Sequence, residues 1–155
     1  MATTLRLAAA AVNQTTFAAR NGIEIASIGR LPIAVIGREA SADVMIRAAL
    51  DARGWRGPAL FVTSANGQVI SECARSPALR ELFLSADLIH ADGMPLVFAS
   101  RIKGRHQLPE RVATTDLFHD VARLAQKTGA SSTCLGPVRP SSSAQRRVSA
   151  PCIPA

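Results

Sequence analysis

The sequence predicts an α/β protein with a Rossmann-like parallel sheet and flanking helices. Short continuous apolar runs, of the kind buried on both faces of a parallel sheet, alternate with segments whose apolar residues recur at helical spacing. This alternation is typical of parallel sheets joined by right-handed crossovers. The length of 155 residues suits one such domain and is too short for two of ordinary size.

The first regular element that we expect is a strand at residues 32–37. The preceding residues 1–31 are rich in Ala and Thr without a clear period, which predicts a loosely ordered extension with at most one helical turn. After the strand, Ser41 is expected to cap a helix that carries Asp43 in its first turn, where the helix dipole favours an acid. Gly54 is expected to end this helix.

The middle of the chain predicts two strands separated by two helices. Residues 59–63 form a continuous apolar run that predicts a buried strand, and residues 64–75 predict the helix that follows. A Ser-Pro pair then suits an N-cap with proline at the first helical position, which predicts a short helix over residues 78–84. The next strand is expected at residues 87–91.

Two more helices and a further strand are expected beyond this point. Residues 95–103 and 116–127 have helical patterns, and Thr114 or Thr115 is the expected cap of the second helix. A strand is then expected at residues 132–136, which would continue the alternation of strand and helix.

The composition changes after this predicted strand. Residues 137–155 are rich in Pro, Ser and Arg, contain no acid and show no apolar period, which predicts a disordered tail. We therefore expect one α/β domain over residues 32–136, with a sheet that is incomplete at its C-terminal end.

The positive charge of the chain is spread along it. The formal net charge is +7, yet residues 32–130 hold twelve Arg or Lys against ten Asp or Glu. The aromatic content is 4% with no Tyr, which leaves few side chains to stack on bases. We therefore expect no nucleic-acid partner. Binding to nucleic acid through the tail is the weaker alternative, since the tail holds only three arginines.

The cysteines fit neither a disulfide framework nor a zinc site. Cys73, Cys134 and Cys152 are odd in number and lie at long, unequal spacings. We interpret them as reduced thiols of a cytoplasmic protein. No apolar run approaches the roughly 18 residues that a membrane-spanning helix needs.

Small polar residues follow two of the predicted strands. Ser64 and Asn66 come after the strand at 59–63, and Asp92 comes after the strand at 87–91. Because open parallel sheets bind ligands at the carboxyl ends of their strands, we expect one site here, with Asp92 placed to accept a proton from a substrate hydroxyl. All three residues also suit ordinary helix capping, and the sequence leaves both interpretations open.

The other candidate residues have ordinary alternatives as well. Arg111 suits bidentate binding of a phosphate or a solvated surface position. Asp116 suits the first turn of a helix better than catalysis, and His90 suits a hydrogen-bonded, partly buried ring in a strand. The sequence shows no metal-ligand spacing, so we expect no metal or other cofactor. If such a metal-free site acted on a nucleotide diphosphate, arginines and helix N-termini would have to stabilise the leaving diphosphate.

Three sequence blocks occur in a specific order. They are Ser64-x-Asn66, the segment 85–95 with its Asp-Gly-Met motif, and Leu-Pro-Glu-Arg-Val at 108–112 followed by Thr-Asp-Leu at 115–117. Together they resemble the bacterial WecG/TagA/CpsF glycosyltransferase family. The resemblance covers residues 32–136, about two thirds of the chain.

The resemblance implies a metal-free, inverting transferase. It would move a hexose, of N-acetylmannosamine type or related, from a UDP-sugar to a polyprenyl-diphosphate-linked acceptor in the synthesis of surface polysaccharide. Asp92 would be the general base, while Ser64, Asn66, Arg111 and Asp116 would bind substrate. The implied location is the cytoplasm, at the inner face of the plasma membrane. Peripheral membrane contact and a homo-oligomer are compatible with these expectations.

The chain departs from the family pattern in two places. Thr114 stands where the family usually has glycine, so a tighter turn is lost. The family also continues through further strands and a Pro-Lys-Gln-Glu-like motif that helps to form the donor pocket, whereas this chain has a tail of the kind a frameshift leaves. We therefore expect a C-terminally truncated product. An inactive remnant that at most binds sugar nucleotide or a lipid head group is the alternative function.

Overall fold

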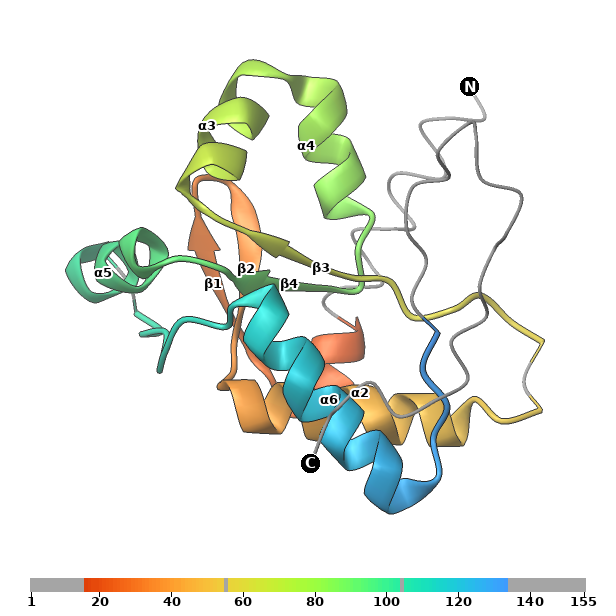
Figure 1. Ribbon diagram of the computed structural model, residues 1–155. Coiled ribbons are helices and arrows are strands. Elements are labelled where there is room, and N and C mark those ends of the chain that lie inside the picture. The colour runs from red at the N-terminus through yellow and green to blue at the C-terminus, as the bar shows by residue number, and fades with distance from the viewer. Residues whose placement is uncertain (1–15, 55, 104, 134–155) are drawn as a thin grey trace, which may run out of the picture.

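The computed structural model describes residues 16–54, 56–103 and 105–133 as a mixed α/β fold (Figure 1). Residues 16–20 are helical and precede the labelled elements. The labelled elements follow in the order β1 (Glu24–Ile28), β2 (Leu31–Val35), α2 (Arg38–Asp51), β3 (Val62–Ala65), α3 (Gly67–Arg75), α4 (Pro77–Leu84), β4 (Leu88–Ala91), α5 (Met94–Lys103) and α6 (Thr114–Thr128). The α/β class predicted from the sequence is confirmed.

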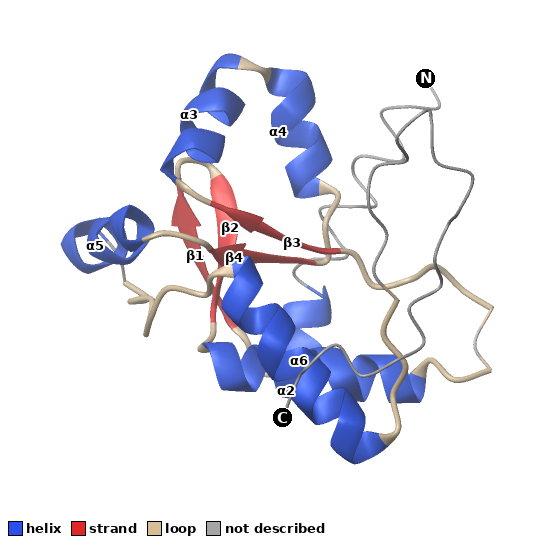
Figure 2. Ribbon diagram, in the orientation of Figure 1, coloured by secondary structure: helices blue, strands red, loops and turns tan. Residues whose placement is uncertain are grey.

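The strands form two pairs. β1 and β2 are antiparallel, whereas β3 and β4 are parallel, and β2 lies beside β4. Helices α3 and α4 lie on one side of the strands, and α2 and α6 pack together on the other side (Figure 2). The predicted parallel sheet is thus limited to the β3–β4 pair within the part of the chain that the structure describes.

The N-terminal hairpin differs from the loosely ordered extension predicted over residues 1–31, of which residues 1–15 lie outside the described ranges. A strand, β1, occupies Glu24–Ile28, and the strand expected at 32–37 is its antiparallel partner β2. Gly29 and Arg30 form the two-residue connection, and both have positive φ, 58° and 67°. This geometry matches the right-handed twist of paired strands. The sequence signal was missed because Gly-Arg is not one of the usual hairpin dipeptides.

The start of α2 also differs from the prediction. Ser41 was expected to be the N-cap, but the N-cap is Gly37 and Ser41 lies buried inside the helix. The side chain of Glu110 replaces a local cap, since its Oε1 accepts a hydrogen bond of 2.8 Å from the backbone N–H of Arg38. A carboxylate at this position also interacts favourably with the helix dipole. A distant residue therefore decides where α2 begins.

The helix ends that depend on neighbouring residues follow the sequence prediction more closely. Ser76 caps α4 through Leu79 N–H at 3.3 Å, with Pro77 at the first helical position. Gly129 ends α6 in the left-handed region, with φ of 70°. The N-cap of α6 is Ala113, although Thr114 or Thr115 was expected.

Two predicted C-terminal elements fall largely outside the described residues. In the strand expected at 132–136, residues 132 and 133 are described and are not in a strand, and the remaining residues lie outside the described ranges. The predicted tail at 137–155 lies outside them as well, as do Cys134 and Cys152. Cys73 is a free, buried thiol.

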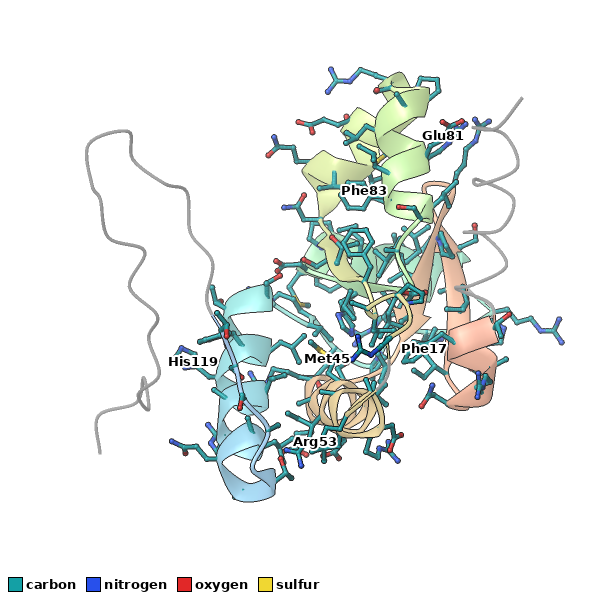
Figure 3. All side chains as sticks on the ribbon, turned by 90° about the vertical axis from the view of Figure 1, so that its right-hand side faces the viewer. Phe17, Met45, Arg53, Glu81, Phe83 and His119 are labelled. Carbon is teal, nitrogen blue, oxygen red and sulfur yellow. The ribbon has the colours of Figure 1, made fainter. Side chains whose placement is uncertain are left out.

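The core consists of three apolar clusters between the strands and the helices (Figure 3). The largest joins β2, β4 and α5, and Phe83 of α4 packs against it. A second cluster lies between α2 and the hairpin and includes the contact of Phe17. The third lies between α2 and α6 and is covered by Met45. All four residues of β4 are buried, which places that strand at the centre of the fold.

The turn of the hairpin gives a test of how closely it packs on α3. A methyl group added at Gly29 would lie 2.2 Å from Ile70 Cγ2, whereas one added at Gly22 would meet nothing within 4 Å, although both glycines have positive φ. We expect Gly22→Ala to cost about 1 kcal/mol from backbone strain alone, and Gly29→Ala to cost about 3 kcal/mol because overpacking adds to the strain. Urea unfolding of both variants measures these losses, and equal losses would contradict the packing of the turn on Ile70.

Candidate active site

The parallel register of β3 and β4 brings two predicted polar clusters together. Ser64 pairs with His90 and Ala65 pairs with Ala91, so the two strands end side by side. The backbone N–H of Asp92 continues the ladder by donating to Ala65 O at 2.8 Å. The structure thus places Asp92 at the carboxyl end of β4, next to the end of β3, as the sequence predicted.

The carboxylate of Asp92 is not used as a helix cap. Asp92 is half-buried, and α5 begins two residues later at Met94. Among the described residues, its side chain has one hydrogen bond, in which Oδ2 accepts from Thr114 Oγ1 at 3.4 Å. The capping alternative is therefore not what the structure shows, and the carboxylate keeps lone pairs that can accept a proton.

The hydroxyl of Ser64 contacts the same Thr114 hydroxyl that donates to Asp92. Ser64 Oγ lies 2.7 Å from Thr114 Oγ1, so the two hydroxyl groups share a hydrogen bond. Thr114 reaches both partners because the preceding segment contacts the end of β4, where Val112 N–H donates to Ala91 O at 2.8 Å. Ser64, Thr114 and Asp92 therefore form a continuous polar chain at the strand ends.

Asn66 has a local structural role. Its Oδ1 accepts a hydrogen bond of 3.0 Å from Val69 N–H and caps α3. The capping alternative considered for Asn66 is thus correct for its oxygen. Its side-chain NH₂ group makes no hydrogen bond within the described part of the chain, and a methyl group added at Gly93 would lie 3.7 Å from Asn66 Cβ. Asn66 consequently borders the loop that contains Asp92.

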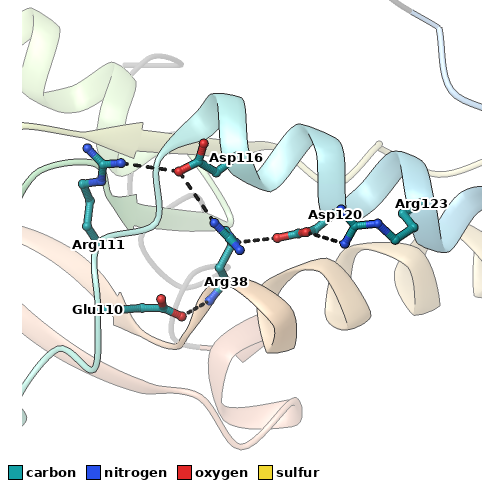
Figure 4. A network of polar contacts seen from close by, with 6 residues as sticks. All are labelled: Arg38, Glu110, Arg111, Asp116, Asp120 and Arg123. Carbon is teal, nitrogen blue, oxygen red and sulfur yellow. Dashed lines mark hydrogen bonds and ion pairs between the residues drawn. The ribbon is translucent and has the colours of Figure 1, made fainter. Parts of the chain in front are cut away.

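Asp116 and Arg111 belong to a network of ion pairs that joins α2 to α6 (Figure 4). Asp116 Oδ2 lies 3.4 Å from a terminal nitrogen of Arg111 and 3.6 Å from one of Arg38. Asp116 lies in the first turn of α6, as one of the two alternatives predicted. Its carboxylate is shared by the guanidinium groups of Arg38 and Arg111. The exposed pairs contribute little to stability, but they restrict where Arg111 lies.

The same network contains a better-buried carboxylate. The side chain of Asp120 is 11% exposed and contacts Arg38 Nε at 2.5 Å and Arg123 at 3.0 Å. Removing a partner from so buried a carboxylate is costly, which favours a fixed contact between the two helices. Arg38 was missed as a site residue because the predicted helix began after it. The available signal was its position directly after a strand.

Two hollows flank these residues. One of about 350 Å³ lies at the start of α2 and is lined by Gly37, Arg38, Glu39, Ala40 and Glu110. The other, of about 290 Å³, lies between β3, β4, α2 and α6, and its wall is mainly apolar. Its polar lining residues are Thr63, Ser64, His90 and Thr114. Two members of the polar chain, Ser64 and Thr114, thus form part of the wall of this mainly apolar hollow.

His90 differs from its prediction. A hydrogen-bonded, partly buried ring was expected, but His90 is 1% exposed and its Nε2 has no partner among the described residues. Burial lowers its pKa from 6.5 to about 4, because a low-polarity environment disfavours the charged ring. His90 is therefore neutral at pH 7.

The described residues contain no cluster of three or more His, Cys, Asp or Glu side chains that could hold a metal ion. No helix in the described ranges is both long enough and apolar enough to cross a membrane.

The fold and the site define an α/β protein that gathers a carboxylate and two hydroxyl groups at the ends of two parallel strands. A network of ion pairs that includes Arg38 and Arg111 joins α2 to α6. The chain belongs to the glycosyl transferase WecG/TagA/CpsF family, whose model matches residues 26–151. Family membership implies a glycosyltransferase of cell-surface polysaccharide synthesis, with a sugar donor and an acceptor as substrates. Searches of curated proteins and of solved structures find no match.

The extent of the family match bears on the predicted boundaries. The match begins at residue 26, inside β1, so the N-terminal hairpin falls partly within it. It ends at residue 151, within the predicted tail and beyond the described residues. The resemblance seen in the sequence, over residues 32–136, lies inside the matched region.

The neutral state of His90 generates a pH-dependent stability. Below the ordinary histidine pKa of 6.5 the unfolded chain binds a proton that the folded protein does not bind until the pH approaches 4. The contribution of neutral His90 to the free energy of unfolding is therefore complete above pH 6.5 and is lost as the pH falls toward 4. The loss amounts to about 3 kcal/mol. Urea unfolding at pH 7 and pH 4 should therefore show a larger loss for the wild type than for His90→Leu. The exposed His119→Gln variant should behave like the wild type, and an equal loss in His90→Leu would contradict the assignment.

Proposed function

We propose that this chain transfers a hexose from a UDP-sugar to a polyprenyl-diphosphate-linked acceptor, with inversion at the anomeric carbon. The observation that carries the proposal is the position of Asp92, whose half-buried carboxylate stands at the end of a parallel strand beside Ser64 and Thr114. Family membership supports sugar transfer as the reaction class.

Asp92 acts as the general base in this proposal. The acceptor hydroxyl oxygen attacks the anomeric carbon while its proton passes to the Asp92 carboxylate. The bond between the anomeric carbon and the donor diphosphate breaks on the opposite face, and its electron pair leaves with UDP. Attack and departure on opposite faces account for the inversion. A positioned base of this kind contributes about a hundred- to ten-thousandfold to the rate.

The remaining site residues hold the two substrates. Arg111 contacts the donor diphosphate, and the guanidinium group of Arg38 lies in the same ion-pair network. Such groups stabilise the negative charge that develops on the leaving diphosphate without the help of a metal. Asp116 contributes by orienting Arg111, because its carboxylate is already shared between the two arginines.

Ser64 and Asn66 contact sugar hydroxyl groups. The oxygen of Asn66 caps α3, so the amide NH₂ is the part that donates to the sugar. The Ser64 hydroxyl lies at the end of β3 and can still accept a hydrogen bond while it shares one with Thr114. Donor and acceptor would thus meet above the ends of β3 and β4.

The proposal is tested by measuring UDP release from a UDP-hexose in the presence of a polyprenyl-diphosphate-linked sugar. We expect Asp92→Asn to lower kcat about a hundred- to ten-thousandfold, since the amide cannot take the proton. Asp43→Asn, the same change on the exposed face of α2, is the matched control and should leave kcat unchanged.

The same assay separates the alternatives. UDP release that is unaffected by Asp92→Asn would remove Asp92 from the role of base. Binding of the UDP-sugar by calorimetry, without any release of UDP, would favour a protein that binds sugar nucleotide but does not transfer the sugar. Absence of both binding and release would reject the proposed function.

A further inference from the structure

Thr114 occupies an unusual place at the start of α6. It is the first residue of the helix, and Ala113 before it has the extended backbone of an N-cap without a side-chain hydrogen bond. The helix is entered through backbone contacts, including Leu117 N–H to Ala113 O at 2.9 Å. The Thr114 hydroxyl therefore does not cap its own helix and points instead to the ends of β3 and β4.

The hydrogen bonds of this hydroxyl have a defined direction. An ionised carboxylate can only accept, so in the contact between Thr114 Oγ1 and Asp92 Oδ2 the hydroxyl is the donor; at 3.4 Å this is a long hydrogen bond. In the contact of 2.7 Å with Ser64, Thr114 must then accept, and Ser64 is the donor. The proton order runs from Ser64 through Thr114 to Asp92, and each hydrogen bond polarises the next.

This order distinguishes the two oxygens of the Asp92 carboxylate. Oδ2 is held by Thr114, whereas Oδ1 makes no hydrogen bond within the described ranges. The backbone of Asp92 is fixed separately, through its N–H to Ala65 O at 2.8 Å. Restraints on the backbone and on Oδ2 together limit rotation of the side chain and leave Oδ1 as the oxygen available to an acceptor hydroxyl.

We propose that Thr114 is a positioning residue, which holds Asp92 Oδ2 so that Oδ1 serves as the base, and that Ser64 orients the Thr114 hydroxyl for this purpose. The inference rests on the proposed function for its catalytic meaning and on the contacts of Thr114 for its geometry. The restraint on the base thus comes from the first residue of α6.

Three variants test the role of the Thr114 hydroxyl. Thr114→Val removes it and keeps the shape of the side chain, Thr114→Ser keeps it, and Thr115→Val makes the same change at the exposed neighbouring residue of the first turn. Urea unfolding confirms that each variant is folded. We expect Thr114→Val to lower kcat for UDP release about tenfold with little change in KM, since a hydrogen bond to a charged group is lost. Thr114→Ser should retain most of the rate, and Thr115→Val should retain all of it.

A second measurement does not require activity. Side-chain coupling constants from NMR report whether Asp92 has one χ1 rotamer or averages between several. We expect one rotamer in the wild type, Thr114→Ser and Thr115→Val, and averaging in Thr114→Val. A single Asp92 rotamer in Thr114→Val overturns the inference, and so does an unchanged kcat in that variant of an active enzyme. If the wild type releases no UDP, the proposed function fails and the rotamer measurement alone decides the role of Thr114.

Discussion

The parallel pairing of β3 with β4 is the constraint on which the candidate site depends. It sets Ser64 opposite His90 and lets the N–H of Asp92 extend the ladder to Ala65. A shift of the register by one residue would turn every side chain of one strand to the opposite face. Ser64 would then leave the hollow that it shares with His90, and the hydroxyl contact with Thr114 would be lost. The chemistry of the site is therefore a consequence of strand register.

The second constraint is the packing of α6 on α2. Arg38 contacts both Asp116 and Asp120, one turn apart on α6, and Asp120 is the more deeply buried of the two carboxylates. Exposed ion pairs contribute little, but a largely buried carboxylate between two arginines strongly favours one relative position of the helices. Because α6 starts at Thr114, this position also sets the hydroxyl beside the strand ends. The network thus connects helix packing to the geometry of Asp92.

The site also contains a feature that opposes stability. His90 lies in the central strand with Nε2 unpaired among the described residues, and burial of an unpaired polar atom is costly. The ring remains neutral because its pKa is lowered to about 4, which keeps a charge out of the apolar hollow at neutral pH. His90 lines the same hollow as Ser64 and Thr114. Unfavourable features such as an unpaired buried polar atom are commonest at the functional sites of proteins.

Patterns within a few residues were enough to predict the α/β class, most of the helices, the cap at Ser76 and the stop at Gly129, because the interactions that decide these features are local. The order of the motifs predicted the family, and the apolar run at 87–91 placed Asp92 at a strand end. Only the tertiary structure decided the antiparallel hairpin, the capping of α2 by Glu110 and the contact of Thr114 with Asp92. Their partners come from strand register and helix packing, which bring together residues far apart in the chain and which no local pattern encodes.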